Sequence, residues 1–129
     1  MVFGIGADIV AVERFSKLKD KEEFLAQVFS PEELSRAPKA NRDRFYASLF
    51  AVKESVLKAL GCGLSRGSFW HDIRVSKDLK VSLSGPLSEL LPAGCDHAIH
   101  ASVSEAGEFA VAYVIIETKI KKRSLPRKH

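Results

Sequence analysis

Two acidic side chains and one lysine lie in apolar segments, where they could support catalysis. Glu54 and Lys58 are four residues apart in the helical segment FAVKESVLKALG, residues 50–61. At about 100° per residue they share a stripe with Ala47 and Ala51. That stripe is roughly opposite the predicted core stripe of Phe45, Leu49, Val52, Val56, Ala59 and Leu60. The small alanines predict an open strip for a ligand, and the alternative is a solvated ion pair worth about 0.2–0.5 kcal/mol.

The second acid, Asp8, interrupts an apolar run near the start of the chain, VFGIGADIVAVERF. A strand would point Asp8 to one side with Gly4, Gly6 and Val10, and would point Phe3, Ile5, Ala7 and Ile9 to the other. The two glycines leave their face bare, so another element or a ligand can approach the backbone. A carboxylate here is costly to bury unless it is paired or holds a metal. The glycines match a nucleotide-binding fingerprint poorly, because the third glycine and the preceding strand are missing.

The elements that position these side chains predict an α+β fold in a single domain, with an antiparallel sheet packed against a long helix. The long helix is expected from about residue 41 to 60, with Gly61 and Gly63 ending it. Ser30, Pro31 and Glu33 form a capping box that begins a shorter helix. Residues 14–28 have looser helical spacing. Two hairpins, at 72–83 and 97–117, flank a short helix at 86–91, and the second turns at 105–108.

Composition and charge narrow the class of protein. The chain has 129 residues, 46% of them apolar, with no apolar run of about 18 residues and no secretory signal. Cys62 and Cys95 are isolated, which predicts reduced thiols in a cytoplasmic protein. Six of the 20 basic residues lie in the segment 119–129, so the rest of the chain has 14 basic and 16 acidic residues, a net charge of −2. We therefore predict a domain at residues 1–118 and a disordered basic tail at 119–129.

Three other patterns are weaker. Residues 63–67 match G-x-S-x-G, but the required order of strand and then helix is reversed. His97 and His100 are three apart on a predicted strand, so they face opposite sides and cannot share a metal. A nucleic-acid-binding module is a further alternative, and the net acidic body and the lack of a stacking motif argue against it.

Two segments together resemble the 4′-phosphopantetheinyl transferases, and specifically their small holo-acyl-carrier-protein synthase branch. GIGADIVAVERF is similar to that family's G-x-D-[IV]-x-x-[IV]-x-R pattern. RDRFYASLFAVKESVLKALGCG is similar to its F-x-x-x-[RY]-F-x-x-K-E-[AS]-x-x-K-A-x-G signature. The match covers about residues 1–117 and implies the family's α+β fold.

The resemblance also implies an activity. Family members move phosphopantetheine from coenzyme A to a serine of apo acyl carrier protein, which releases 3′,5′-ADP and supports fatty acid biosynthesis. Asp8 and Glu54 match the two carboxylates that bind Mg²⁺, and Lys58 matches the lysine that neutralises or protonates the leaving phosphate. Lys53 would add charge to the same pocket, with a helix-surface role as the alternative. Gly61 and Gly63 lie where the family's backbone closes around the coenzyme.

Substrate recognition is expected from basic residues. Arg14 matches a family arginine after the first strand, and Lys17 and Lys21 would extend a basic face for the acidic carrier protein. The alternative for the two lysines is a solvated helix surface. A second basic cluster, which could hold the 3′-phosphate of coenzyme A, consists of Arg36, Lys39, Arg42 and Arg44.

Two positions depart from the family pattern. Glu105 follows Ser102-Val103-Ser104 where the family commonly has a histidine near the coenzyme, and Lys77-Asp78-Leu79-Lys80 replaces a Gly-Lys-Pro sequence. Because a carboxylate would repel phosphates, we expect Glu105 to face solvent or to pair with a nearby base. The small synthases are trimers with active sites between subunits, so the resemblance implies a homotrimer without membrane association. The competing hypothesis is a non-catalytic homologue that binds carrier protein or coenzyme A.

Overall fold

The computed structural model describes residues 1–62 and 69–121. Their elements, in chain order, are strand β1 (Val2–Ala11), helices α1 (Glu13–Ser16), α2 (Lys21–Val28), α3 (Pro31–Ser35) and α4 (Arg42–Ala59), strands β2 (Ile73–Val75) and β3 (Val81–Leu83), helix α5 (Gly85–Ser88), and strands β4 (Cys95–Ala106) and β5 (Phe109–Ile120). The predicted α+β class is confirmed. The segment with looser helical spacing divides into α1 and α2, because Asp20 takes a left-handed conformation between them.

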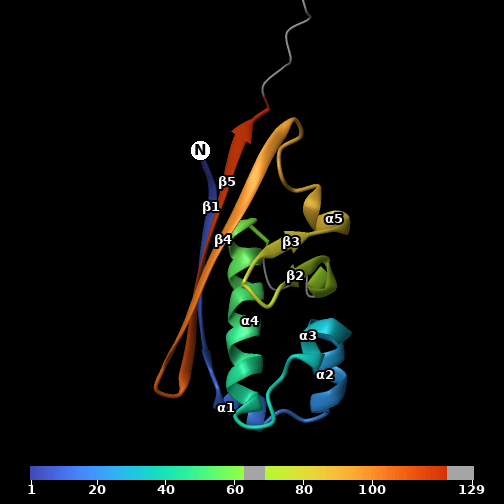
Figure 1. Cartoon of the computed structure of the whole chain (residues 1–129), viewed down its shortest axis with the longest axis vertical. Helices are drawn as coiled ribbons and strands as arrows, with labels where there is room; N and C mark the ends of the chain where they lie inside the picture. The colour runs from blue at the N-terminus through green and yellow to red at the C-terminus, as the bar shows by residue number, and fades with distance from the viewer. Residues whose placement is uncertain (63–68, 122–129) are drawn as a thin grey trace, which may run out of the picture.

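Helix α4 is the central layer of the molecule. Strand β5 pairs antiparallel with β1 on one side and β4 on the other, and β2 pairs with β3 in a separate hairpin. Figure 1 shows the three-stranded sheet along one side of α4, and α2, α3, α5 and the β2–β3 hairpin on the other side. The predicted packing of an antiparallel sheet against a long helix is therefore confirmed.

The glycines of β1 allow α4 to lie directly on the strand. A Cβ atom added at Gly4 would be 1.8 Å from the carbonyl oxygen of Ala59, and one added at Gly6 would be 1.8 Å from that of Ser55. Both positions therefore exclude any larger residue while α4 stays in place. The expectation that another element approaches this bare face is confirmed.

The same close approach makes the prediction of an open strip on the long helix wrong. Ala47 and Ala51 are completely buried. Their stripe of α4 continues to Ser55, whose hydroxyl donates to the carbonyl oxygen of Ala112 on β5 at 3.4 Å. The stripe is therefore covered by the sheet, and only its C-terminal end, at Lys58, reaches solvent.

The outer face of β1 and β5 is largely apolar. Alternate residues of β1 and β5 point inward, so Val10, Ala112, Val114 and Ile116 are buried. The residues between them form what we call the outer apolar face: Ile5, Ile9, Phe109, Tyr113 and Ile115, all 40–65% exposed. No described helix combines the length and the apolar character needed to cross a membrane. Strand β5 extends two residues into the predicted basic tail, and the tail residues 122–129 lie outside the described residues.

Candidate active site

Asp8 and Lys58 meet where β1 crosses the C-terminal half of α4. Lys58 Nζ donates to Asp8 Oδ1 at 2.9 Å and to the carbonyl oxygen of Ala7 at 3.0 Å. The Asp8 side chain is 12% exposed, and that of Lys58 is 47% exposed. The pair therefore joins a nearly buried carboxylate to a lysine that solvent can reach.

Glu54 is the second carboxylate of this site. Its side chain is 7% exposed, and Arg14 Nη1 lies 3.8 Å from Glu54 Oε1. The pKa of Glu54 is raised to about 7, mainly by burial and also by charge repulsion and a side-chain hydrogen bond from the neighbouring Asp8, against the opposing charges of Arg14 and Lys58. The sequence prediction that Asp8, Glu54 and Lys58 share one site agrees with this geometry.

The donor set of this site fits a magnesium ion that is held mainly by its substrate. In residues 1–62 and 69–121, no three His, Cys, Asp or Glu side chains gather as a metal cage. Two adjacent carboxylates provide hard oxygen donors, and they repel one another when both are charged. Mg²⁺ typically uses one or two carboxylates and takes its other ligands from phosphates and water. Asp8 and Glu54 are suited to that arrangement.

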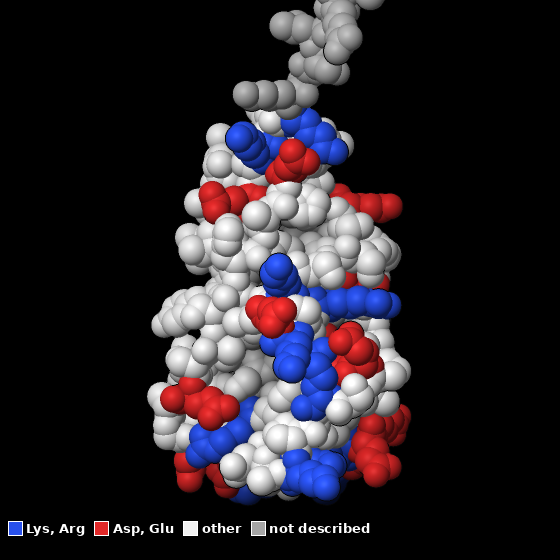
Figure 2. Space-filling model, in the orientation of Figure 1, with Lys and Arg blue, Asp and Glu red and all other residues white. Residues whose placement is uncertain are grey.

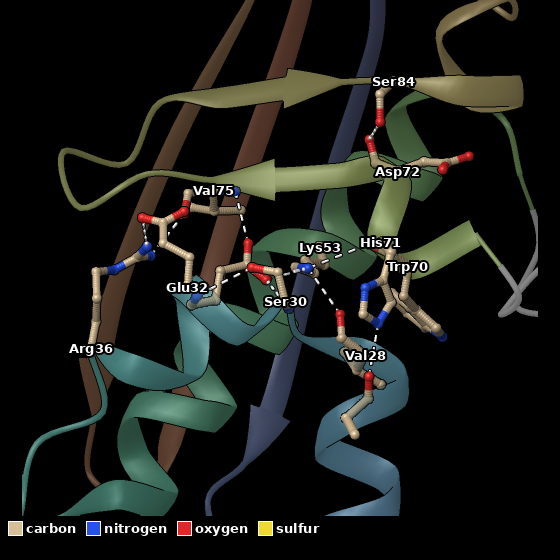
Figure 3. A network of polar contacts seen from close by, with 12 residues as sticks. Val28, Ser30, Glu32, Arg36, Lys53, Trp70, His71, Asp72, Val75 and Ser84 are labelled. Atoms are coloured by element: carbon tan, nitrogen blue, oxygen red, sulfur yellow. Dashed lines mark hydrogen bonds and ion pairs between the residues drawn. The ribbon is translucent and has the colours of Figure 1, made fainter.

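Lys53 does not join this site, so its assignment to the coenzyme pocket is corrected. It is completely buried, and its Nζ lies 2.7 Å from Glu33 Oε1. It also donates to the carbonyl oxygens of Val28 at 2.9 Å and Trp70 at 3.3 Å (Figure 3). Burial lowers the pKa of Lys53, and Glu33 opposes this shift. The helix-surface alternative is equally wrong, because Lys53 holds α4 to the segments beside it.

Glu33 is the residue that sequence reasoning missed. Its predicted capping box with Ser30 is confirmed. Its second carboxylate oxygen also accepts a hydrogen bond from the Val75 amide at 2.9 Å, so Glu33 connects α3, α4 and β2. The available signal was Lys53 itself, which stands between two core residues, Val52 and Val56, and needs a buried acid.

The predicted coenzyme residues have different surroundings. Arg44 lines a cavity of about 630 Å³ near the β4–β5 turn, which we call the turn cavity. Arg42 does not line it, and its Nε donates to the carbonyl oxygen of Pro38 at 2.9 Å. Gly61 follows α4 with a positive φ of 80°, as its predicted role in ending the helix requires. Gly63 and the G-x-S-x-G match lie outside the described residues.

A second cavity, of about 460 Å³, adjoins the turn cavity. We call it the hairpin cavity, because it lies between α4 and the β2–β3 hairpin and its lining includes Leu49, Val75 and Leu79. Phe45, Ser48 and Val103 line both cavities, so the two lie side by side, and together we call them the trough. Phe45 and Glu54 point to opposite sides of α4 at about 100° per residue. The trough and the carboxylate pair are therefore on opposite sides of this helix.

Glu105 pairs with a base, as expected. Its Oε2 lies 3.7 Å from Arg44 Nη1, and its Oε1 accepts a hydrogen bond from the Ser48 hydroxyl at 3.4 Å. Arg44 Nη1 also donates to the carbonyl oxygen of Gly107 in the β4–β5 turn at 2.8 Å. The arginine that would meet a phosphate is thus already held by a carboxylate and a carbonyl group.

The three predicted docking residues lie on α1, α2 and the link between them. Arg14 is 54% exposed, and its guanidinium carbon is 5.0 Å from the centre of the Phe50 ring. Lys17 pairs with Glu13 at 2.6 Å, and Lys21 pairs with Asp43 at 2.5 Å. On the face shown in Figure 2, basic and acidic side chains are interspersed. This pattern differs from a uniformly basic nucleic-acid surface.

Comparisons with known proteins show the family of this chain. A family model described as the 4′-phosphopantetheinyl transferase superfamily matches residues 4–114. The holo-[acyl-carrier-protein] synthase of Rhizobium leguminosarum bv. trifolii is 38% identical, over 91% of this chain and 96% of the relative. That of Geobacter sulfurreducens is 36% identical, over 91% and 98%.

Solved structures give the same result. The Helicobacter pylori holo-[acyl-carrier-protein] synthase in complex with coenzyme A superposes with a TM-score of 0.72 at 28% identity, over 88% of this chain and 99% of that one. The Neisseria meningitidis synthase superposes with a TM-score of 0.71 at 30% identity, over 91% and 99%. A family model matches most of this chain, and the chain covers more than nine-tenths of the length of both relatives. This chain therefore belongs to the 4′-phosphopantetheinyl transferase superfamily.

Proposed function

We propose that the protein is an enzyme that transfers 4′-phosphopantetheine from coenzyme A to a serine of apo acyl carrier protein, and that it supports fatty acid biosynthesis in the cytoplasm. The observation that carries the proposal is the pair of adjacent, nearly buried carboxylates, Asp8 and Glu54, beside the exposed amine of Lys58. The transfer forms a bond from the serine oxygen to the phosphorus of phosphopantetheine and breaks the bond from that phosphorus to 3′,5′-ADP. The serine loses its proton in the process.

Each residue of the site has a chemical part in this reaction. Asp8 and Glu54 would hold Mg²⁺, which when bound supplies positive charge to the pyrophosphate and lowers the pKa of a nearby hydroxyl. Lys58 places an ammonium group 2.9 Å from Asp8, where it can neutralise or protonate the departing phosphate. Arg14, 3.8 Å from Glu54, fixes the second carboxylate by its charge.

The trough is the best place for the nucleotide part of coenzyme A. Its hairpin cavity is lined by apolar side chains that suit the adenine ring, including Leu49, Val75 and Leu79. Its turn cavity presents the guanidinium of Arg44 to the 3′-phosphate, and Arg42 lies farther along the same end of α4. Gly61 has a positive φ, and a Cβ added there would meet no atom within 4 Å, so the backbone after α4 is open to a ligand at this point.

We further propose that the active enzyme is a homotrimer. The outer apolar face, with Ile5 and Ile9 each more than half exposed, is unusually apolar for a surface that meets water. The trough and the carboxylate pair lie on opposite sides of α4, so coenzyme A bound in one trough would need a neighbouring subunit to supply Asp8 and Glu54. Association through the outer apolar face would cover it and bring the two halves together.

Carrier protein is proposed to dock at Arg14, Lys17 and Lys21, beside the carboxylate pair. Of these, Arg14 and Lys17 are more than half exposed, and an acidic helix could replace Glu13 as the partner of Lys17. Docking here would bring the acceptor serine to the side of α4 that carries Glu54.

Mass spectrometry of apo carrier protein, incubated with this protein, coenzyme A and Mg²⁺, tests the proposal. A mass gain of one phosphopantetheine group is expected. Asp8→Asn and Glu54→Gln change ligand charge with little change of shape, so each should abolish transfer, keep the fold by circular dichroism, and weaken Mg²⁺ binding in calorimetry. Binding of carrier protein without any mass gain would instead identify a non-catalytic homologue.

A further inference from the structure

The turn cavity is lined by one positive and one negative side chain, and this pairing of charges bears on substrate choice. Among the described residues that line it, Arg44 and Glu105 are the charged ones. Their ion pair, 3.7 Å long, leaves this cavity with a net charge of zero. A cavity that binds a phosphate would ordinarily present an excess of positive charge, so Glu105 opposes the ligand that Arg44 would attract.

The contacts of this pair are arranged so that the charge of Glu105 can be removed without displacing Arg44. Arg44 is held independently by its 2.8 Å hydrogen bond to the carbonyl oxygen of Gly107. The Ser48 hydroxyl, which donates to Glu105 at 3.4 Å, can donate equally to an amide oxygen. Glu105→Gln is therefore an electrostatic change with little change of shape.

We propose that Glu105 is a specificity-determining residue. Its negative charge weakens the preference of the protein for coenzyme A over 3′-dephospho-coenzyme A, which lacks the 3′-phosphate. This inference rests on the proposed function, because it assumes that the nucleotide lies in the trough. Glu105 acts through the charge of the turn cavity and takes no part in the bond that forms or breaks. Its effect therefore belongs in KM, and kcat is expected to stay within a few-fold of the wild-type value.

The test compares the two donors at constant ionic strength and with saturating carrier protein. Two charges about 4 Å apart interact in water by about 1 kcal/mol, which corresponds to about a fivefold change in KM. Glu105→Gln should lower KM for coenzyme A about fivefold and leave KM for 3′-dephospho-coenzyme A unchanged. Glu105→Asp keeps the charge and should keep the wild-type ratio. Arg44→Gln should raise KM for coenzyme A alone.

Asp96→Asn is the matched control. Asp96 lies on the same strand, β4, and pairs with exposed Lys121 at 3.9 Å, so this variant removes one negative charge away from the cavity. It should not alter the ratio of the two KM values. If Glu105→Gln changes both KM values equally or neither, or if Asp96→Asn gives the same shift, the assignment of Glu105 is wrong.

A binding measurement separates this inference from the proposed function. Calorimetry that compares the affinities for 3′,5′-ADP and 5′-AMP measures the effect of the 3′-phosphate on binding without any transfer. Tighter binding of 3′,5′-ADP alone by Glu105→Gln would support the inference even for a protein that transfers nothing. Equal affinities of the wild type and Glu105→Gln for 3′,5′-ADP would overturn the inference even for an active enzyme.

Discussion

A single methyl group added to β1 should separate the two halves of the carboxylate site. In Gly6→Ala, the new Cβ would lie 1.8 Å from the carbonyl oxygen of Ser55, 2.8 Å from its carbonyl carbon and 2.9 Å from the Ala59 amide nitrogen. All three are backbone atoms of α4, so no side chain can turn away. Because such contacts are rarely shorter than about 3 Å, α4 and β1 must move apart by about 1 Å or more.

That movement has two measurable consequences. Overpacking of this kind costs about 1–3 kcal/mol, which for a domain of this size lowers Tm by roughly 3–15 °C. It also lengthens the 2.9 Å contact between Asp8 and Lys58 and moves Asp8 away from Glu54. Since a misplacement of about 1 Å can reduce a rate about 100-fold, we expect kcat for phosphopantetheine transfer to fall by about that factor.

Differential scanning calorimetry and the mass-spectrometric transfer assay would measure both effects. Gly94→Ala is the control, because Gly94 has a positive φ of 75° but no atom within 4 Å of an added Cβ. That variant should lose about 1–2 kcal/mol through backbone strain and keep its transfer rate. A Gly6→Ala protein with wild-type Tm and wild-type kcat would refute the account of how β1 and α4 assemble the site.

Three further predictions concern charged side chains. The pKa of Glu54 rises from 4.5 to about 7 on folding, so between pH 4.5 and pH 7 the folded, metal-free protein binds more protons than the unfolded chain. Its free energy of unfolding should therefore fall by up to about 3 kcal/mol as the pH rises from 4.5 to 7. Urea denaturation at pH 5 and pH 8 should show this loss, and Glu54→Gln should remove it. Lys53→Met leaves the buried carboxylate of Glu33 unpaired and should lower the free energy of urea-induced unfolding by about 3–5 kcal/mol, with partial recovery in the double variant that adds Glu33→Gln. Arg14→Glu should raise KM for carrier protein more than KM for coenzyme A, and equal changes in steady-state kinetics would place Arg14 outside the docking surface.

Local sequence patterns predicted the elements well, because each is specified by residues close together in the chain. The capping box of Ser30 and Glu33 and the glycine that follows the end of α4, Gly61, need only a few neighbouring residues. The alternation of β5 and its turn to β4 are equally local, so the hairpin was predicted with its ends only two to three residues short.

Contacts between distant segments were harder to predict. The sequence shows that Ala47 and Ala51 share a face with Glu54, but only the position of the sheet shows that this face is covered. Lys53 was misplaced for the same reason, because its partner Glu33 is on another helix and already has a local role as a cap. By contrast, Asp8 could be placed correctly because its two glycines signal a close neighbour.

The order of strands in the sheet has a consequence for how the chain folds. Strand β1 has a single partner in the described sheet, β5, and their register joins Val2 to Glu117 and Asp8 to Ala112. During synthesis, β1 leaves the ribosome about 100 residues before this partner, and the edge that pairs with β5 cannot be satisfied until that strand follows. Helix α4 can cover one face of β1 in the meantime, since both lie within the first 60 residues. The carboxylate pair should therefore begin to assemble early but become rigid only when β5 docks. The docking of β5 is then the folding step that completes the proposed catalytic site.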